Sequence, residues 1–174
     1  MLRLRPYKSA DAKTIEKWIQ DEDIFQKWGG ELFGTFPISA KIIDDKYRLQ
    51  NGDCKEPDNF YPWVAVDESG NAVGHFIMRY LNGDRDLLRF GWVIVDDQAR
   101  GKGYGTQMLS LGLKYAFEIL GVKKVTIGVF ENNDPAHKCY SRLGFWETGI
   151  VEKKPWNVIE MEIDHGIYAH RSVL

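Results

Sequence analysis

The spacing of apolar residues along the chain switches between a period of two and a period of three to four, which separates strands from helices. Apolar side chains alternate with others through residues 125–129, as in a strand. Before them, Tyr104, Met108 and Leu111 recur at helical spacing, and Gly121 stands where a left-handed helix cap is expected. The same patterns predict, in chain order, a strand over 2–7, helices over 9–20, 21–28 and 39–50, strands over 61–67, 72–80 and 86–95, a helix over 103–120, a strand over 123–130, a helix over 134–143, and strands over 144–151 and 156–164.

The connections between these elements predict the fold class. Residues 67–71 and the pair Asn82-Gly83 have the composition of hairpin turns, which join antiparallel strands. The helix over 103–120 instead connects two strands as a crossover, which makes those two strands parallel. We therefore expect an α/β (α+β) fold with a mixed, mostly antiparallel central sheet flanked by helices. No linker, low-complexity run or internal repeat divides the chain, so residues 1–174 are expected to form one domain.

Composition narrows the classes of partner. The chain has 174 residues, of which 44% are hydrophobic and 28% charged, as is ordinary for a globular protein. Its formal net charge of −2 argues against nucleic acid as the main partner and against a polybasic membrane contact. The alternation of leucine and arginine from residue 2 leaves no room for a signal peptide, and no apolar run approaches the roughly 18 residues of a membrane span. The expected location is cytoplasmic.

The cysteines and histidines do not predict a metal site. Cys54 and Cys139 are far apart in the sequence, without a Cys-x-x-Cys pair. The four histidines lack a ligand spacing such as His-Glu-x-x-His. No metal is therefore expected, and a reducing compartment is consistent with this cysteine usage.

Three alternating glycines carry the strongest chemical signal. Gly101, Gly103 and Gly105 lie between a β-branched strand end and a predicted helix. Main-chain N–H groups without side-chain cover at a helix start favour an anion such as a phosphate. The dinucleotide-binding fingerprint would need a glycine where Thr106 stands, and the nucleoside-triphosphate loop would need one where Asp96 stands. Both of those readings are excluded.

Two segments resemble the GNAT superfamily of N-acyltransferases. Residues 100–105, Arg-Gly-Lys-Gly-Tyr-Gly, match the pattern Gln/Arg-x-x-Gly-x-Gly/Ala of its coenzyme A pyrophosphate loop. Residues 133–145 match its second signature, Asn-x-x-Ala-x-x-x-Tyr-x-x-x-Gly-Phe, at the usual distance downstream. In this segment Asp134 is predicted to cap a helix whose first position is Pro135. Residues 2–5 and 9–12 resemble the opening of the ribosomal-protein N-terminal acetyltransferases of this superfamily.

The resemblance implies that acetyl-CoA is the cosubstrate and that the parallel pair of strands splays around it. The strand before the glycines would offer main-chain groups to the pantetheine arm and the acyl carbonyl. The turn would hold the pyrophosphate, with added positive charge from two basic side chains. The cofactor-binding residues implied in this way are Val93, Ile94, Val95, Arg100, Gly101, Lys102, Gly103, Tyr104, Gly105, Thr106 and Asn133.

The resemblance also implies a catalytic residue. Tyr140 matches the tyrosine that protonates the leaving thiolate, although a buried core aromatic is the alternative interpretation of this residue. The glutamate that related acetyltransferases often place on the strand after the long helix is replaced by Gly128. His75, Glu131 or water could take the proton of the amine, and the general base stays unassigned.

The expected function is an acetyl-CoA-dependent N-acetyltransferase that transfers the acetyl group, by direct attack, to a primary amine of a small molecule or of a protein N-terminus. The alternative is a non-catalytic coenzyme A-binding sensor or interaction module, which the glycine at 128 permits and the intact Tyr140 and Asn133 oppose. The aromatic and acidic first 63 residues suit an amine, and residues 28–31 resemble a short motif of aminoglycoside N-acetyltransferases. The polar loop 51–60 is either a surface joint or part of a lid. The sequence does not decide whether the protein forms a homodimer.

Overall fold

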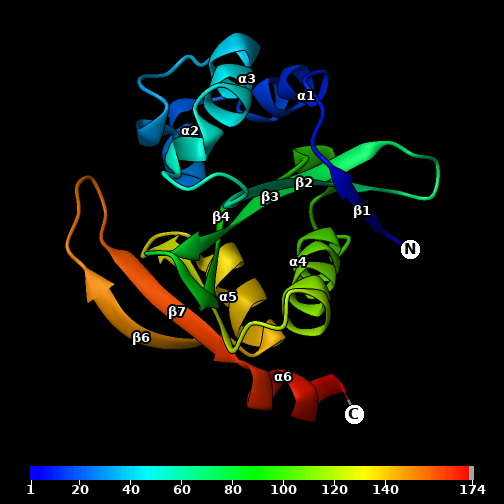
Figure 1. The fold of residues 1–174 in the computed structure, drawn as a ribbon. Coiled ribbons are helices and arrows are strands. Elements are labelled where there is room, and N and C mark those ends of the chain that lie inside the picture. Colours follow the sequence, from blue (N-terminus) through cyan, green and yellow to red (C-terminus); the bar gives the residue numbers. More distant parts are fainter. Residues whose placement is uncertain (173–174) are drawn as a thin grey trace.

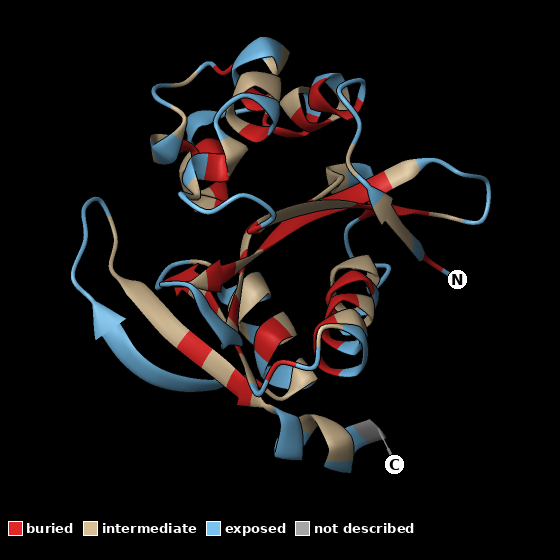
Figure 2. Cartoon of the chain, viewed as in Figure 1, coloured by how far each residue is buried: buried red, intermediate tan, exposed pale blue. Residues whose placement is uncertain are grey.

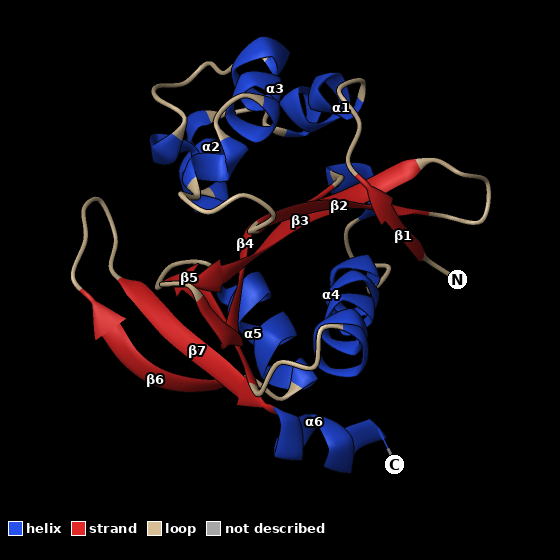
Figure 3. Ribbon diagram, in the orientation of Figure 1, coloured by secondary structure: helices blue, strands red, loops and turns tan. Residues whose placement is uncertain are grey.

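A computed structural model describes residues 1–172 and contains one seven-stranded mixed sheet, with strand order β1-β2-β3-β4-β5-β7-β6 (Figures 1 and 3). Within these residues β4 and β5 pair in parallel, and the other neighbouring strands pair antiparallel. The predicted fold class is therefore confirmed. The strands are β1 (Arg3–Pro6), β2 (Phe60–Val66), β3 (Ala72–Leu81), β4 (Asp84–Val95), β5 (Lys124–Phe130), β6 (Trp146–Val151) and β7 (Val158–Asp164).

Helices cover both faces of the sheet. On one face, α1 (Asp11–Trp18), α2 (Glu22–Trp28) and α3 (Ala40–Arg48) pack over β3 and β4 (Figure 1). On the other face lie α4 (Tyr104–Lys114), which continues as a π-helical turn (Tyr115–Ile119), and α5 (Asp134–Leu143). Helix α6 (His165–Ser172) follows β7, and 3₁₀ turns occupy Gly30–Leu32, Asn51–Asp53 and Asp97–Ala99. Figure 2 shows β3 largely buried between the layers, whereas β4 is buried at alternate positions of its second half and β6 is exposed along its length.

Most predicted elements are confirmed, whereas one helix was not predicted and one predicted helix cap is wrong. Helix α6 escaped prediction because its few apolar positions give only a weak helical pattern. Helix α5 is capped by Asn133 rather than Asp134, since the Asn133 side chain accepts a hydrogen bond from the N–H of Ala136 at 3.4 Å. Asp134 is instead the first helical residue, where a negative charge still favours the helix N-terminus. No helix within residues 1–172 is long and apolar enough to cross a membrane.

The parallel pair separates after a few residues. β4 and β5 pair from Leu87 opposite Lys124 to Phe90 opposite Ile127, and beyond these positions both strands continue without pairing to each other. A bulge in β4 causes this separation. It is seen as a shift in the register of β4 against β3 between the positions of Ile77 and His75. A bulge bends its strand and increases its twist. The sheet therefore opens as a wedge between the carboxyl ends of β4 and β5.

Trp92 stands in the bulge with a left-handed backbone. Its φ of 44° is unusual for a bulky residue and costs on the order of 1–3 kcal/mol. The N-terminal helical layer holds this conformation, since the Trp28 indole N–H donates a buried hydrogen bond to the Trp92 carbonyl at 3.0 Å. Gly29 lets the chain pass closely, because a Cβ there would lie 3.1 Å from the Trp92 ring. Helix α2 is thus fastened to the edge of the wedge.

Candidate active site

A cleft of about 800 Å³ occupies the wedge. It runs from the glycine turn and α5 on one side to α2 and the segment between β6 and β7 on the other. Of the cofactor residues implied by the sequence, Lys102 is exposed and is not in the cleft wall. The sequence-predicted residues that line the cleft are Val93, Ile94, Val95, Arg100, Gly101, Gly103, Tyr104, Gly105, Thr106, Asn133 and Tyr140.

The glycine turn leaves the start of α4 uncovered. Gly101 and Gly103 have φ values of 77° and 74°, which glycine adopts without strain. Gly103 precedes the first helical residue, and no side chain caps the helix there. A Cβ at either position would meet nothing within 4 Å. The first N–H groups of α4 therefore border open space on the cleft, where they suit an anion.

Tyr140 belongs both to the core and to the cleft wall. Its side chain is 5% exposed and packs at a ring distance of 6.2 Å from Phe145. Burial raises the pKa of its phenol, so the hydroxyl stays protonated across the physiological range. Tyr140 is thus a buried core aromatic that also borders the cleft, and its role as proton donor stays a prediction. A buried phenol at a cleft wall can donate a proton to a nearby thiolate but is a poor base.

Asn133 has two roles in the geometry. Its side-chain oxygen caps α5, which fixes the amide group at the end of β5. Its side-chain NH₂ is then the part that can donate a hydrogen bond into the cleft. The match to an asparagine that bonds a pantetheine amide is compatible with this position.

The β4 bulge is a feature of the cleft wall that the sequence analysis missed. A bulge leaves main-chain groups of the extra residue outside the strand ladder. Here these groups belong to Trp92 and Val93, and both residues line the cleft. Gly91 was the available signal, since a glycine inside a strand pattern often marks a bulge.

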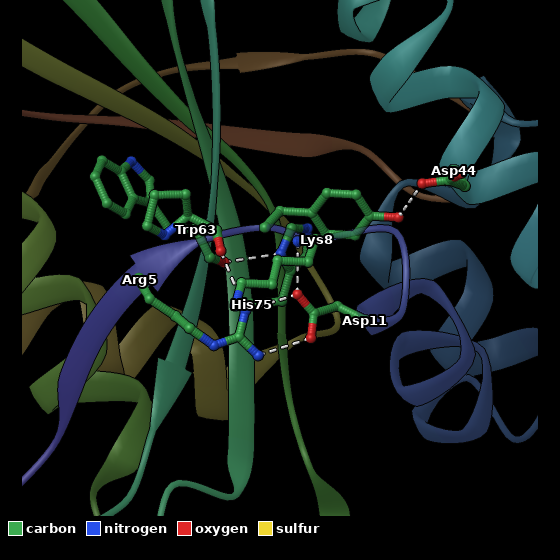
Figure 4. Close-up of polar contacts among 8 residues, drawn as sticks. Arg5, Lys8, Asp11, Asp44, Trp63 and His75 are labelled. Atoms are coloured by element: carbon green, nitrogen blue, oxygen red, sulfur yellow. Dashed lines mark hydrogen bonds and ion pairs between the residues drawn. The ribbon is translucent and has the colours of Figure 1, made fainter.

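His75 is not placed to act as the base. It is fully buried under the N-terminal helices and is not among the residues that line the cleft. Its Nδ1 lies 2.8 Å from the Trp63 carbonyl and must donate, so its Nε2 accepts from the Tyr47 hydroxyl at 2.7 Å. Figure 4 shows His75 beside Trp63, Arg5 and Asp11, with Arg5 paired to Asp11 at 2.8 Å. Its role is structural.

Burial lowers the pKa of His75 to about 4, which predicts a pH-dependent stability. The unfolded chain takes up this proton near pH 6.5, whereas the folded protein resists it until about pH 4. The stabilisation is therefore complete above pH 6.5 and is lost as the pH falls toward 4, by about 3 kcal/mol. Urea unfolding at several pH values should show this loss. The His75→Gln variant should lose that part of the pH dependence, and replacement of the exposed His170 by glutamine should keep it.

The other candidate bases are also occupied. Glu131 accepts two hydrogen bonds from Asn157, each at 3.2 Å, and does not line the cleft. At Gly128, a Cβ would lie 2.7 Å from a guanidinium nitrogen of Arg89. Arg89 forms a two-bond ion pair with Glu160, at 2.6 and 3.0 Å, on the strand position that pairs with Gly128. The space of the expected glutamate is thus bordered by an ion pair from neighbouring strands.

The far part of the cleft, which we call the α2 side, is rich in charge. Its charged lining residues are Asp23, Lys27, Glu31, Arg79, Arg89 and Lys153. One oxygen of Glu31 pairs with Lys153, on the segment between β6 and β7 that rises toward α2 in Figure 1. The other, Oε2, is buried and has no hydrogen-bond partner among the described residues. Residues 51–60 contribute nothing to the cleft wall, so a surface joint describes that loop better than a lid.

Comparison with known proteins identifies the family. The family model of the acetyltransferase (GNAT) domain matches residues 1–146. The SPbeta prophage-derived uncharacterized N-acetyltransferase YokL of Bacillus subtilis is 31% identical, over 78% of this chain and 77% of that protein. The spermidine N(1)-acetyltransferase of Vibrio cholerae is 24% identical over 87% of this chain and 83% of its own length.

A solved structure has the same fold. The crystal structure of spermidine N-acetyltransferase from Vibrio cholerae in complex with CoA and spermine superposes with a TM-score of 0.79. The match covers 97% of this chain and 98% of that one, at 22% identity. This likeness concerns the fold, whereas the family model covers most of the sequence. The chain therefore belongs to the GNAT acetyltransferase family, whose enzymes transfer an acetyl group from acetyl-CoA to an amine.

Proposed function

We propose that this protein acetylates a primary amine of a small molecule by direct attack on acetyl-CoA, with Tyr140 as the proton donor. The observation that carries the proposal is the single cleft that connects an open helix start, a main-chain bulge and a buried tyrosine. The fold alone would not require the helix start, the bulge and the tyrosine to line the same cleft.

The cofactor half of the cleft fits coenzyme A. We propose that the main chain of residues 101–106 holds the pyrophosphate, with Arg100 and Arg142 as nearby positive charges in the cleft wall. Val93, Ile94 and Val95 would present main-chain groups to the pantetheine arm and the acyl carbonyl, and Asn133 would add a side-chain donor. Lys102, which is exposed, would contribute through its charge alone.

The reaction exchanges one bond for another. The amine nitrogen forms a bond to the acyl carbon, and the bond between that carbon and sulfur breaks. The Tyr140 hydroxyl gives its proton to the departing thiolate and regains one from solvent. The amine releases its proton to water, because His75, Glu131 and Gly128 supply no base in the cleft. Main-chain donors of the β4 bulge polarise the acyl carbonyl.

The α2 side is the proposed binding place of the acceptor. The ion pair between Glu31 and Lys153 links the turn after α2 to the segment between β6 and β7 and so borders this side of the cleft. Such a closed border favours a small molecule over a protein N-terminus. The unpartnered Oε2 of Glu31 can accept a hydrogen bond from the incoming ammonium group.

Replacing Glu31 by glutamine is expected to raise KM for the amine about 10-fold, because a charge-assisted hydrogen bond is lost. The value of kcat and the KM for acetyl-CoA should change little. Steady-state kinetics with thiol release as the readout measure all three. The matched control is Glu22→Gln, which changes an exposed carboxylate at the start of α2, outside the cleft. An unchanged KM for the amine in Glu31→Gln would exclude this role.

A panel of amines tests the proposed function as a whole. Thiol release from acetyl-CoA that depends on an added amine would support catalysis. Tight binding of coenzyme A without turnover on any class of amine would favour the alternative, a coenzyme A-binding sensor or interaction module. A peptide panel with free N-termini, run beside the small amines, decides between the two acceptor classes.

A further inference from the structure

The charges on the α2 side of the cleft do not all cancel. Three of its cationic side chains are held in ion pairs with carboxylates. The pairs are Lys27 with Asp23 at 2.9 Å, Lys153 with Glu31, and Arg89 with Glu160 at 2.6 Å. The fourth cation, Arg79, has no carboxylate within 4.0 Å among the described residues.

The thiol next to Arg79 does not neutralise its charge. Arg79 contacts the thiol of Cys54, and burial raises the pKa of that thiol. The thiol therefore stays neutral, and the guanidinium keeps its full charge. Arg79 is half-buried and lines the cleft, so this charge faces the space in which an acceptor would lie.

Two guanidinium groups stand side by side on the sheet. Arg79 on β3 is the register partner of Arg89 on β4, so the two side chains share one face. Like charges directly opposite each other destabilise a strand pair. Glu160 forms an ion pair with Arg89 and not with Arg79. The fold therefore retains an unfavourable pairing whose positive charge is available to a ligand.

The next pair of residues on this face of the sheet lies between the two arginines and the wedge. Ile77 on β3 pairs with Gly91 on β4, and Gly91 places no side chain between the arginines and the bulge. Val93 follows Arg89 by four residues, a stretch of at most about 13 Å because the bulge at Trp92 shortens it. A guanidinium group and the acyl carbonyl site can thus contact two ends of one molecule only when several bonds separate them.

Resting on the proposed function, we infer that the acceptor is an amine that carries an oxyanion, either a carboxylate or a phosphate, several bonds from the nitrogen, and that Arg79 binds this oxyanion. Arginine presents paired donors that match both groups. A polyamine would instead bring a second ammonium group toward an unpaired guanidinium, while the carboxylates of this side, apart from the one unpartnered oxygen of Glu31, are engaged with lysines and Arg89. The acceptor would therefore differ in charge from the spermidine named for the Vibrio cholerae relative.

Four amines of one chain length test this inference. They are 6-aminohexanoate, 6-aminohexyl phosphate, hexylamine and 1,6-diaminohexane. We expect kcat/KM for at least one of the two anionic amines to exceed that for hexylamine about 30-fold, in the range of a charge-assisted pair, and 1,6-diaminohexane to be the poorest substrate. The better of the two anionic amines identifies the kind of oxyanion.

Variants assign the preference to Arg79. Arg79→Gln should bring kcat/KM for the anionic amines down to the value that the same variant shows for hexylamine, while KM for acetyl-CoA stays unchanged. Arg79→Lys should keep part of the preference, which a merely structural role would not explain. The control is Arg85→Gln, an exposed arginine that stacks on Tyr80 outside the cleft.

The outcomes separate the inference from the proposed function. Turnover that favours 1,6-diaminohexane, or an anion preference that survives Arg79→Gln, would overturn the inference and leave the acetyltransferase intact. If no amine is acetylated, the proposed function fails. Calorimetric binding of 6-aminohexanoate and 6-aminohexyl phosphate to the coenzyme A complex of the wild type and Arg79→Gln then decides the role of Arg79. Equal affinities would contradict it. Thermal unfolding and coenzyme A binding check that each variant is folded.

Discussion

Replacing Tyr140 by phenylalanine is expected to lower kcat about 100-fold or more, the range that general acids supply. The change removes one hydroxyl from a side chain that is buried in the core and faces the cleft. The ring still fills its space, so the fold and the affinity for acetyl-CoA should be preserved. Because burial raises the pKa of Tyr140, the hydroxyl stays protonated, and so holds the proton to be donated, throughout the working pH range. Single-turnover kinetics separate this step from product release.

The control for Tyr140 is another tyrosine outside the cleft. In Tyr61→Phe the lost hydroxyl donates to the Asp58 carbonyl at 2.6 Å and lies away from the cleft wall. This variant should turn over at the wild-type rate. Wild-type kcat in a folded Tyr140→Phe would mean that Tyr140 is core packing and that the thiolate receives its proton from water.

Replacing Gly105 by valine is expected to weaken coenzyme A binding about 100-fold, equivalent to about 3 kcal/mol. A Cβ at this position would lie 3.6 Å from Val95 and 3.8 Å from the sulfur of Cys139, which are ordinary contacts. The fold should therefore accept the substitution. The rest of the valine side chain would occupy the cleft beside the main-chain N–H groups at the start of α4. Calorimetric titration with coenzyme A measures the loss.

Gly105 gives a cleaner test than Gly103. Valine at Gly103 should also weaken binding, but its φ of 74° would strain any other residue and confuse binding with stability. Gly149→Val on the exposed strand β6 is the matched control, because a Cβ there meets nothing within 4 Å. If a folded Gly105→Val protein binds coenzyme A with wild-type affinity, the pyrophosphate lies elsewhere.

The residues that meet in the central part of the cleft wall could be predicted because their signals are local in the sequence. The turn at residues 100–105 and the segment at 133–145 each combine backbone geometry and side chains within one short stretch. The crossover helix between them required a parallel strand pair, and the structure contains it between β4 and β5. Tyr140 reached the cleft for the same reason, since it follows Asn133 by two turns of one helix.

The general base was a different problem, because it depends on burial and long-range partners. An imidazole such as that of His75 can act as a general base, but the N-terminal helices bury this one. Tyr47 and Trp63 also engage both of its ring nitrogens. In the sequence, Gly128 indicated only that the expected glutamate is missing. The structure shows a glycine that leaves room for Arg89 and Glu160, which are 71 residues apart in the chain.

The sequence by itself determined the order of the elements, the mixed sheet, the glycine turn and the family, because periodicity, turn residues and two motifs are properties of neighbouring residues. Only the tertiary structure decided which charges meet across the α2 side of the cleft. Glu31 and Lys153 are 122 residues apart, and the partnerless state of Arg79 follows from strand register and from the carboxylates taken by other cations. Such pairings depend on distances of a few ångströms between distant segments, since the energy of a charge in a cleft is set by what lies next to it in space.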